Sequence, residues 1–76
     1  MLITTLDIGL IVRKVRNQSN MTQKQLAMIT GTGQRFISDL ENGKETCQIE
    51  KSLKVIQMLG IKIKLDVSLL DIEQKS

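Results

Sequence analysis

Three polar side chains stand together at the start of a short predicted helix, and their types suit the reading of a nucleic acid. They are Gln34, Arg35 and Ser38. In the major groove of DNA, a glutamine amide can form two hydrogen bonds with adenine, and an arginine guanidinium can form two with guanine. The three positions share one side of a helix, because residues three and four apart are neighbours on its surface. Their spacing therefore predicts a polar face that can lie against base edges.

A second helix is predicted directly before this one, over residues 22–30, and a tight turn joins the two. Thr22 and Gln25 have the spacing of a capping box, in which each side chain bonds the backbone N–H of the other residue. Gly31 is suited to end the helix, because glycine adopts the left-handed conformation at little cost. The buried side is predicted to comprise Leu26, Ala27 and Ile29. Two short helices joined in this way form a helix-turn-helix, whose second helix enters the major groove.

Two further helices are predicted on either side of this pair, over residues 5–19 and 48–59, which makes the fold class mostly α with four helices. In both, apolar residues recur at helical spacing. The first has Ile8, Ile11, Val12 and Val15, and the last has Ile49, Leu53, Ile56 and Met58 or Leu59. In the helix over residues 34–42, Ile37 and Leu40 face inward. Gly9 lies inside the first helix, where glycine costs about 1 kcal/mol relative to alanine.

After Gly60 the hydrophobic pattern changes from helical spacing to strict alternation. The apolar residues of this segment are Ile61, Ile63, Leu65 and Val67. A period of two predicts a half-buried β-strand over residues 61–68. A lone strand leaves its backbone unpaired, so we expect it to pair with the same strand of a second copy, with the apolar residues at the dimer interface. The predicted organisation is a helix-turn-helix and dimerisation domain over residues 1–68 and a short tail over residues 69–76.

The composition argues against an enzyme or a metalloprotein. The 76 residues include one cysteine and no histidine, which excludes an internal disulfide and argues against a Cys/His metal site. The commonest general base is also missing, and Asp39 and Glu41 point in different directions on a helix, so they form no acid–base pair. No cofactor is predicted. The lone thiol of Cys47 fits a reducing, cytoplasmic setting, and the sequence has no visible spanning segment or secretory signal.

Positive charge is concentrated in the middle of the chain. Residues 13–44 hold six basic and two acidic side chains, whereas the whole chain has a formal net charge of +3. A nucleic acid is therefore a candidate partner, because phosphate neutralisation dominates the affinity of proteins for nucleic acids. The alternative is a solvated surface of mixed charges, and charge alone leaves that alternative open.

The motif residues follow a pattern known from other proteins. Thr22-Gln-x-x-Leu-Ala, then Gly31, then Ile37-Ser38-x-x-Glu41-x-Gly43, resembles the Xre/lambda-repressor-like helix-turn-helix family. The run from residue 35 to residue 44, followed by a helix and an Ile-Lys-Ile-Lys-Leu strand, resembles the HipB-type antitoxins within that family. This resemblance implies a homodimer that binds the operator DNA of its own operon. It also implies that the protein neutralises a HipA-type serine/threonine kinase toxin.

The residues and the resemblance together predict a set of DNA contacts. The set is Gln23, Thr32, Gln34, Arg35, Ser38, Asn42 and Lys44. The resemblance implies that Gln23 touches a phosphate and braces Gln34, and that Arg16 pairs with Glu41 to clamp the first helix to the third. Thr32, Asn42 and Lys44 lie in the flanking turns, where phosphate contacts are expected. The chain has Thr-Gly at 32–33 where the family usually has Val-Ser, so the third helix is expected to lack a capping side chain.

Each of these roles has an alternative. Gln34 and Arg35 can be exposed polar residues at a helix start, and Ser38 can face solvent without touching DNA. Three functions remain open at this point. They are an antitoxin that also represses its own operon, a stand-alone repressor without a toxin partner, and a protein-interaction module that has lost DNA binding.

Overall fold

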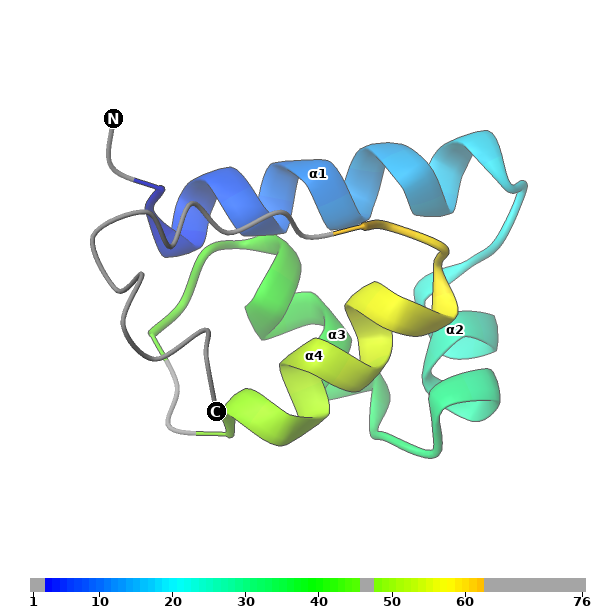
Figure 1. Ribbon diagram of the computed structural model, residues 1–76. Coiled ribbons are helices and arrows are strands. Elements are labelled where there is room, and N and C mark those ends of the chain that lie inside the picture. The colour runs from blue at the N-terminus through cyan, green and yellow to red at the C-terminus, as the bar shows by residue number, and fades with distance from the viewer. Residues whose placement is uncertain (1–2, 46–47, 63–76) are drawn as a thin grey trace, which may run out of the picture.

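The computed structural model describes residues 3–45 and 48–62. These residues form four α-helices, which are α1 (Thr5–Gln18), α2 (Gln23–Thr30), α3 (Gln34–Glu41) and α4 (Ile49–Met58). Figure 1 shows α1 running along one side of the domain, with the three shorter helices beside it. The mostly helical helix-turn-helix fold is confirmed, and each helix ends within one residue of its predicted bounds. The predicted strand beyond Lys62, the tail and Cys47 lie outside the described residues.

The helix starts follow the capping signals of the sequence. Thr4 and Asp7 form a capping box at the start of α1, and Thr22 and Gln25 form the predicted one at the start of α2. As expected, the N-cap residue of α3 is Gly33, which provides no capping side chain. These local bonds satisfy backbone N–H groups that have no partner inside the helix, so they fix where two of the four helices begin.

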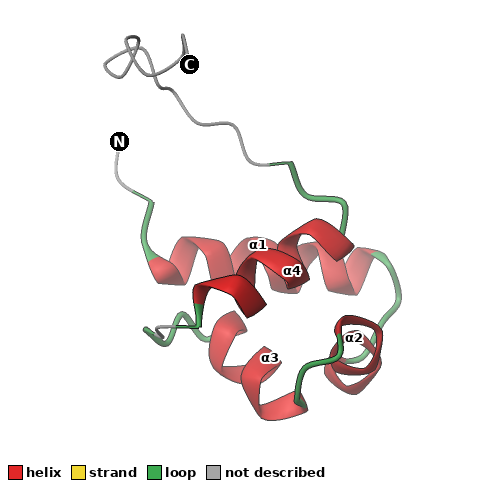
Figure 2. Cartoon of the chain, turned by 60° about the horizontal axis from the view of Figure 1, so that its bottom comes forward, coloured by secondary structure: helices red, strands yellow, loops and turns green. Residues whose placement is uncertain are grey.

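The core is small and is built from all four helices. Its buried apolar residues are Val12, Leu26, Ala27, Ile37, Leu40, Val55 and Ile56. Helix α3 packs against both α1 and α2, and α2 also packs against α4, an arrangement that Figure 2 shows from below. The prediction of a buried Ile29 is wrong, because Ile29 is exposed and the fully buried position is Thr30. Thr30 tolerates burial because its hydroxyl donates to the backbone oxygen of Leu26 at 2.8 Å.

The predicted apolar stripe of α4 is also only partly buried. Val55, which the prediction omitted, is completely buried beside Ile56, whereas Ile49 is 66% exposed and Leu53 is 39% exposed. The side of α4 that faces the core therefore differs from the side that the spacing of its apolar residues predicted. Ile11 of α1 is likewise half exposed. Among residues 3–45 and 48–62, nothing covers the apolar surface that runs along these two helices.

Gly9 permits the close packing of α1 on the end of α3. A Cβ atom at this position would lie 2.4 Å from the carbonyl oxygen of Leu40 and 2.6 Å from that of Glu41. Any side chain would therefore push the two helices apart. From the sequence alone, Gly9 was predicted only to weaken the helix. Its packing against Leu40 and Glu41 was not predicted, because these residues lie far from it along the chain.

Within the described residues, none of the helices is long and apolar enough to cross a membrane. The same residues contain no cluster of three or more acidic, cysteine or histidine side chains that could hold a metal ion.

Candidate nucleic-acid interface

The exposed face of α3 carries the residues predicted to read bases. Gln34 and Arg35 are exposed and Ser38 is half-buried, on the side of α3 away from Ile37 and Leu40. Among residues 3–45 and 48–62, no hydrogen bond or ion pair holds the side chains of Gln34, Arg35 or Ser38. Their donors and acceptors are therefore available to a partner.

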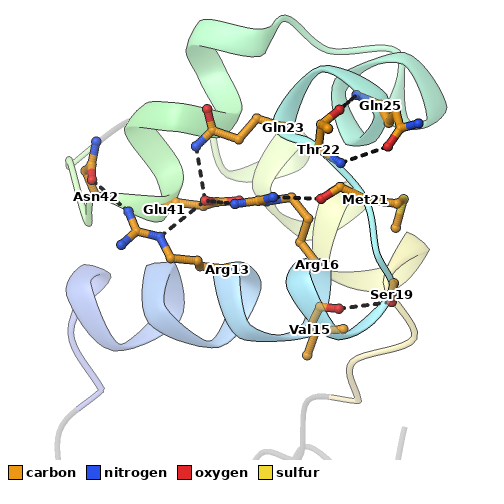
Figure 3. Close-up of polar contacts among 10 residues, drawn as sticks. All are labelled: Arg13, Val15, Arg16, Ser19, Met21, Thr22, Gln23, Gln25, Glu41 and Asn42. Atoms are coloured by element: carbon orange, nitrogen blue, oxygen red, sulfur yellow. Dashed lines mark hydrogen bonds and ion pairs between the residues drawn. The ribbon is translucent and has the colours of Figure 1, made fainter.

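A buried carboxylate of α3 forms hydrogen bonds that connect α3 with α1 and α2. Glu41, at the end of α3, has a fully buried side chain. It accepts two hydrogen bonds from Arg16 of α1, at 2.5 Å from Nε and 2.9 Å from Nη2 (Figure 3). The remaining Nη1 of Arg16 donates to the backbone oxygen of Met21 at 2.7 Å. The predicted Arg16–Glu41 pair is thus present, and it also holds the turn between α1 and α2.

Two more side chains complete the set around Glu41. Its Oε1 atom accepts from Gln23 Nε2 of α2 at 3.1 Å and from Arg13 Nε of α1 at 3.4 Å. We call Arg13, Arg16, Gln23 and Glu41 the carboxylate clamp. Among the described residues, no buried side-chain nitrogen or oxygen is left without a partner, so the clamp satisfies its polar groups internally. It fixes the position of α3 relative to α1 and α2.

The clamp alters the acidity of its members. Burial disfavours the charged form of Glu41, but the hydrogen bonds from Arg16, Gln23 and Arg13, together with the charge of Arg16, outweigh burial and lower the pKa of Glu41. The hydrogen bond to Glu41 raises the pKa of Arg16 above its ordinary value. Glu41 is therefore ionised at neutral pH although it is buried.

Some of the predicted phosphate contacts are already engaged inside the protein. Gln23 directs its amide nitrogen to Glu41, and Figure 3 shows its oxygen turned away from the clamp. Asn42 accepts from Arg13 Nη2 through its Oδ1 atom at 3.0 Å. Lys44 lies 3.8 Å from Asp39, but both side chains are exposed, and an exposed pair of this kind contributes little to stability.

Thr32 has used its hydrogen-bond donors within the protein. Its hydroxyl lies 2.9 Å from the hydroxyl of Thr30. The single proton of Thr30 goes to the Leu26 carbonyl, which can only accept, so Thr32 is the donor in the hydroxyl pair. Its backbone N–H donates to Ala27 at 2.9 Å. A phosphate contact from Thr32 would therefore require it to give up one of these bonds.

Sequence reasoning missed Arg13, which joins the clamp to the exposed surface. The signal was present, because Arg13 lies three residues before Arg16 and the two share one side of a helix. This spacing was not sufficient to predict the role of Arg13, because the sequence alone does not show that Asn42 lies close to α1.

Comparisons with known proteins agree with this geometry. Residues 12–65 match the family model described as helix-turn-helix. The chain is 53% identical over 60 residues, covering 79% of each protein, to an uncharacterized HTH-type transcriptional regulator, y4mF, of Sinorhizobium fredii.

Several solved structures have the same fold. A HipA-HipB-O2-O3 complex contains a chain with a TM-score of 0.76 and 25% identity, over 90% of this chain and 96% of that one. A HipB-O4 20mer complex gives a TM-score of 0.75 at 25% identity, over the same shares of the two chains. The restriction-modification controller protein C.AhdI from Aeromonas hydrophila gives 0.67 at 22% identity, over 76% of this chain and 84% of that one, which shows the shared fold alone.

Proposed function

The chain belongs to the Xre-like helix-turn-helix family, and from this premise we propose that it is a sequence-specific DNA-binding transcriptional regulator. The observation that carries the proposal is the exposed face of α3, where Gln34, Arg35 and Ser38 have no partner among the described residues. Polar side chains with free donors and acceptors at the start of a recognition helix are what base reading requires. Members of this family share a DNA-binding regulator fold, and the family is not a class of enzymes.

The proposed contacts fall into two groups. Gln34, Arg35 and Ser38 read base edges, because their side chains are free to adjust to the groove. The other proposed contacts, which position the protein on the phosphate backbone, are Gln23, Thr32, Asn42 and Lys44. Gln23 and Asn42 are held by the protein itself, as suits residues that fix register and carry no sequence information.

The protein acts as a homodimer in this proposal. Ile8, Ile11 and Ile61 line an apolar groove beside α1, and Ile49 and Leu53 line a second one beside α4. Contiguous exposed apolar surface on a small domain marks an interaction site, and Ile61 begins the alternating segment predicted to pair between copies. The proposed interface therefore includes Ile61, Ile63, Leu65 and Val67, and a two-fold dimer requires a palindromic DNA site.

We further propose that the regulator is the antitoxin of a type II toxin–antitoxin system, which represses its own operon and neutralises a HipA-type kinase toxin. Support comes from the similarity to the HipB chain of a complex that also contains HipA. A stand-alone regulator without a toxin is the second candidate, and the similarity to y4mF, named only as a transcriptional regulator, favours it equally.

Selection of duplexes from a random-sequence pool tests the DNA-binding proposal. We expect the protein to enrich a palindromic site with half-sites about one helical turn, or a small multiple, apart. Arg35→Ala should cost roughly 1–3 kcal/mol of binding free energy and relax the preference at one base pair per half-site. Lys44→Ala should weaken binding to all duplexes alike and reduce the dependence on salt. Equal losses on selected and random DNA in both variants would contradict the assignment of Arg35 to base reading.

Co-purification with the product of the neighbouring gene tests the antitoxin proposal. A stable complex with a kinase-like protein, and inhibition of its kinase activity, would support the antitoxin. Regulated expression from the selected site without such a complex would favour the stand-alone regulator.

A further inference from the structure

Arg13 links the buried clamp to the exposed end of α3. Its Nε atom lies 3.4 Å from Glu41 Oε1, and its Nη2 atom lies 3.0 Å from Asn42 Oδ1. Glu41 is itself held by Arg16 and Gln23. Figure 3 shows the Arg13 guanidinium between the two acceptors. One arginine therefore transmits the fixed position of the clamp to a side chain at the surface.

The bond from Arg13 decides which end of the Asn42 amide faces outward. A guanidinium only donates hydrogen bonds, and an amide has one accepting end and one donating end. Arg13 therefore holds the oxygen of Asn42, and the amide nitrogen is left for a partner. The opposite orientation would set two donors against each other. Asn42 is exposed, so its nitrogen is accessible.

Asn42 lies at the far end of a line of polar residues that begins at the start of α3. Gln34, Ser38 and Asn42 are four residues apart in turn, so they follow one line along α3. In the helix-turn-helix arrangement the start of the recognition helix contacts base edges. The far end of the line then leaves the groove near a phosphate, which can only accept hydrogen bonds.

We propose that Arg13 is a positioning residue for DNA binding, which orients the Asn42 amide as a fixed donor to one phosphate in each half-site. This inference rests on the proposed DNA-binding function. It assigns to α1 a role in recognition that does not require α1 to touch the DNA. The alternative is that Arg13 contacts a phosphate directly, in which case its effect on binding would not depend on Asn42. An experiment can therefore distinguish positioning from direct contact.

A double-mutant cycle on the duplex selected by the wild-type protein tests the proposal. Arg13→Ala and Asn42→Ala should each weaken binding about tenfold, as expected for one hydrogen bond to a charged group. The double variant should be no weaker than the weaker single variant, because both changes remove the same contact. Lys14→Ala is the matched control, since it removes a neighbouring positive charge from α1 that makes no bond to Asn42. Its effect should add to that of Asn42→Ala.

Two further measurements separate positioning from folding. Ethylation interference should identify one phosphate per half-site that becomes insensitive in both Arg13→Ala and Asn42→Ala. Asn42→Asp keeps the acceptor for Arg13 but presents an oxygen to the phosphate, so it should weaken binding more than Asn42→Ala. Asn42 is exposed, and its variants should melt within a few degrees of the wild type.

Additive losses from Arg13→Ala and Asn42→Ala would overturn the proposal, as would an interference pattern that Arg13→Ala leaves unchanged. Failure of the wild-type protein to select any duplex would overturn the proposed function itself.

Discussion

The carboxylate clamp and the apolar surface of α1 and α4 both include residues of α1, but the part of the chain that the structure describes completes only the clamp. In the clamp, as elsewhere in the described residues, every buried side-chain nitrogen and oxygen has a partner. Along α4, in contrast, Ile49 and Leu53 remain 66% and 39% exposed. Hydrogen bonds are directional and are satisfied by a few well-placed neighbours, whereas apolar burial requires an extended second surface.

This difference indicates which properties belong to the single chain. The orientation of α3 is set within one copy, because the clamp joins α1, α2 and α3 without outside help. The apolar surface gains its stabilisation only when something covers it, and we propose that a second copy does so. Changes to the two surfaces should therefore depend differently on protein concentration, and the following predictions use this contrast.

Removal of the clamp carboxylate should have the largest effect. Glu41→Ala leaves Arg16 partly buried without its counter-charge, and breaking a buried ion pair on one side costs about 3–5 kcal/mol. We expect a loss of this size in the free energy of unfolding, measured by urea denaturation. Asp39→Ala is the control, because it removes a partly exposed acid from the same helix, whose pair with Lys44 lies at the surface. A loss below about 1 kcal/mol would show that the clamp is not central to the fold.

Gly9→Ala should have the next largest effect. It should destabilise the protein, although helix propensity alone would predict that alanine stabilises it. In an exposed helix this change would stabilise by about 1 kcal/mol. Here the added methyl group meets the backbone oxygens of Leu40 and Glu41, and overpacking typically costs about 1–3 kcal/mol. Asn17→Ala, at an exposed position of α1, should be neutral or stabilising. A stabilised Gly9→Ala variant would mean that α1 and α3 can separate freely.

Lower pH should weaken the clamp reversibly. The pKa of Glu41 lies below its ordinary value of 4.5 in the folded protein. Between these two values the unfolded chain binds the proton more readily, so stability rises with pH in that window. The contribution is complete above pH 4.5 and is lost as the pH falls through the folded pKa. The slope of unfolding free energy against pH should decrease in Glu41→Gln.

Asp7 titrates in the same direction, because hydrogen bonds from the backbone and side chain of Thr4 lower its pKa. Asp7→Asn therefore separates the contribution of the α1 cap from that of the clamp. If Glu41→Gln left the slope of unfolding free energy against pH unchanged, Glu41 would not be the group whose titration changes the stability.

The apolar surface should respond through association. Ile49→Asp places a charge at a position of α4 that is 66% exposed, where it should change the stability of one folded chain by less than about 0.5 kcal/mol. In a dimer the same charge would be buried without a partner. We expect the dimer dissociation constant, measured by sedimentation, to rise at least about tenfold. Met28→Asp, at an exposed apolar residue of α2, is the control and should leave it unchanged.

These predictions also mark the limit of what the sequence revealed. The helices and the caps at Thr22 and Gly31 were predictable, because their signals lie within a few residues. The buried positions of Thr30 and Val55 were not, because the rotation of each helix is set by packing against distant elements. Gly9 could not be understood for the same reason, since its neighbours are at the end of α3.

The candidate site was predictable to a similar extent. The free face of Gln34, Arg35 and Ser38 followed from helical spacing, and the Arg16–Glu41 pair followed from a family resemblance. The internal bonds of Gln23 and Asn42 required the tertiary structure, because each joins residues that lie far apart in the sequence. The seven proposed DNA contacts and the paired strand remain predictions.

The smallest expected effect lies at the uncapped start of α3. Gly33 has φ −98° and ψ 155°, a conformation open to any residue, and a Cβ atom there would meet nothing within 4 Å. Gly33→Ser should therefore supply an acceptor for a free backbone N–H of α3 and stabilise the fold by a few tenths of a kcal/mol. Thermal melting would measure this gain. Gly33→Ala, which adds the Cβ atom without the acceptor, should not show it.

The same variant tests whether the backbone at Gly33 approaches the duplex. If it does, the side chain that stabilises the free protein should weaken DNA binding, and Gly33→Ala should weaken it as well, because both add bulk at the contact. Stability and affinity would then change in opposite directions at one position. Unchanged affinity in both variants would instead mean that α3 meets the DNA through Gln34, Arg35 and Ser38 alone, with its first turn clear of the phosphates.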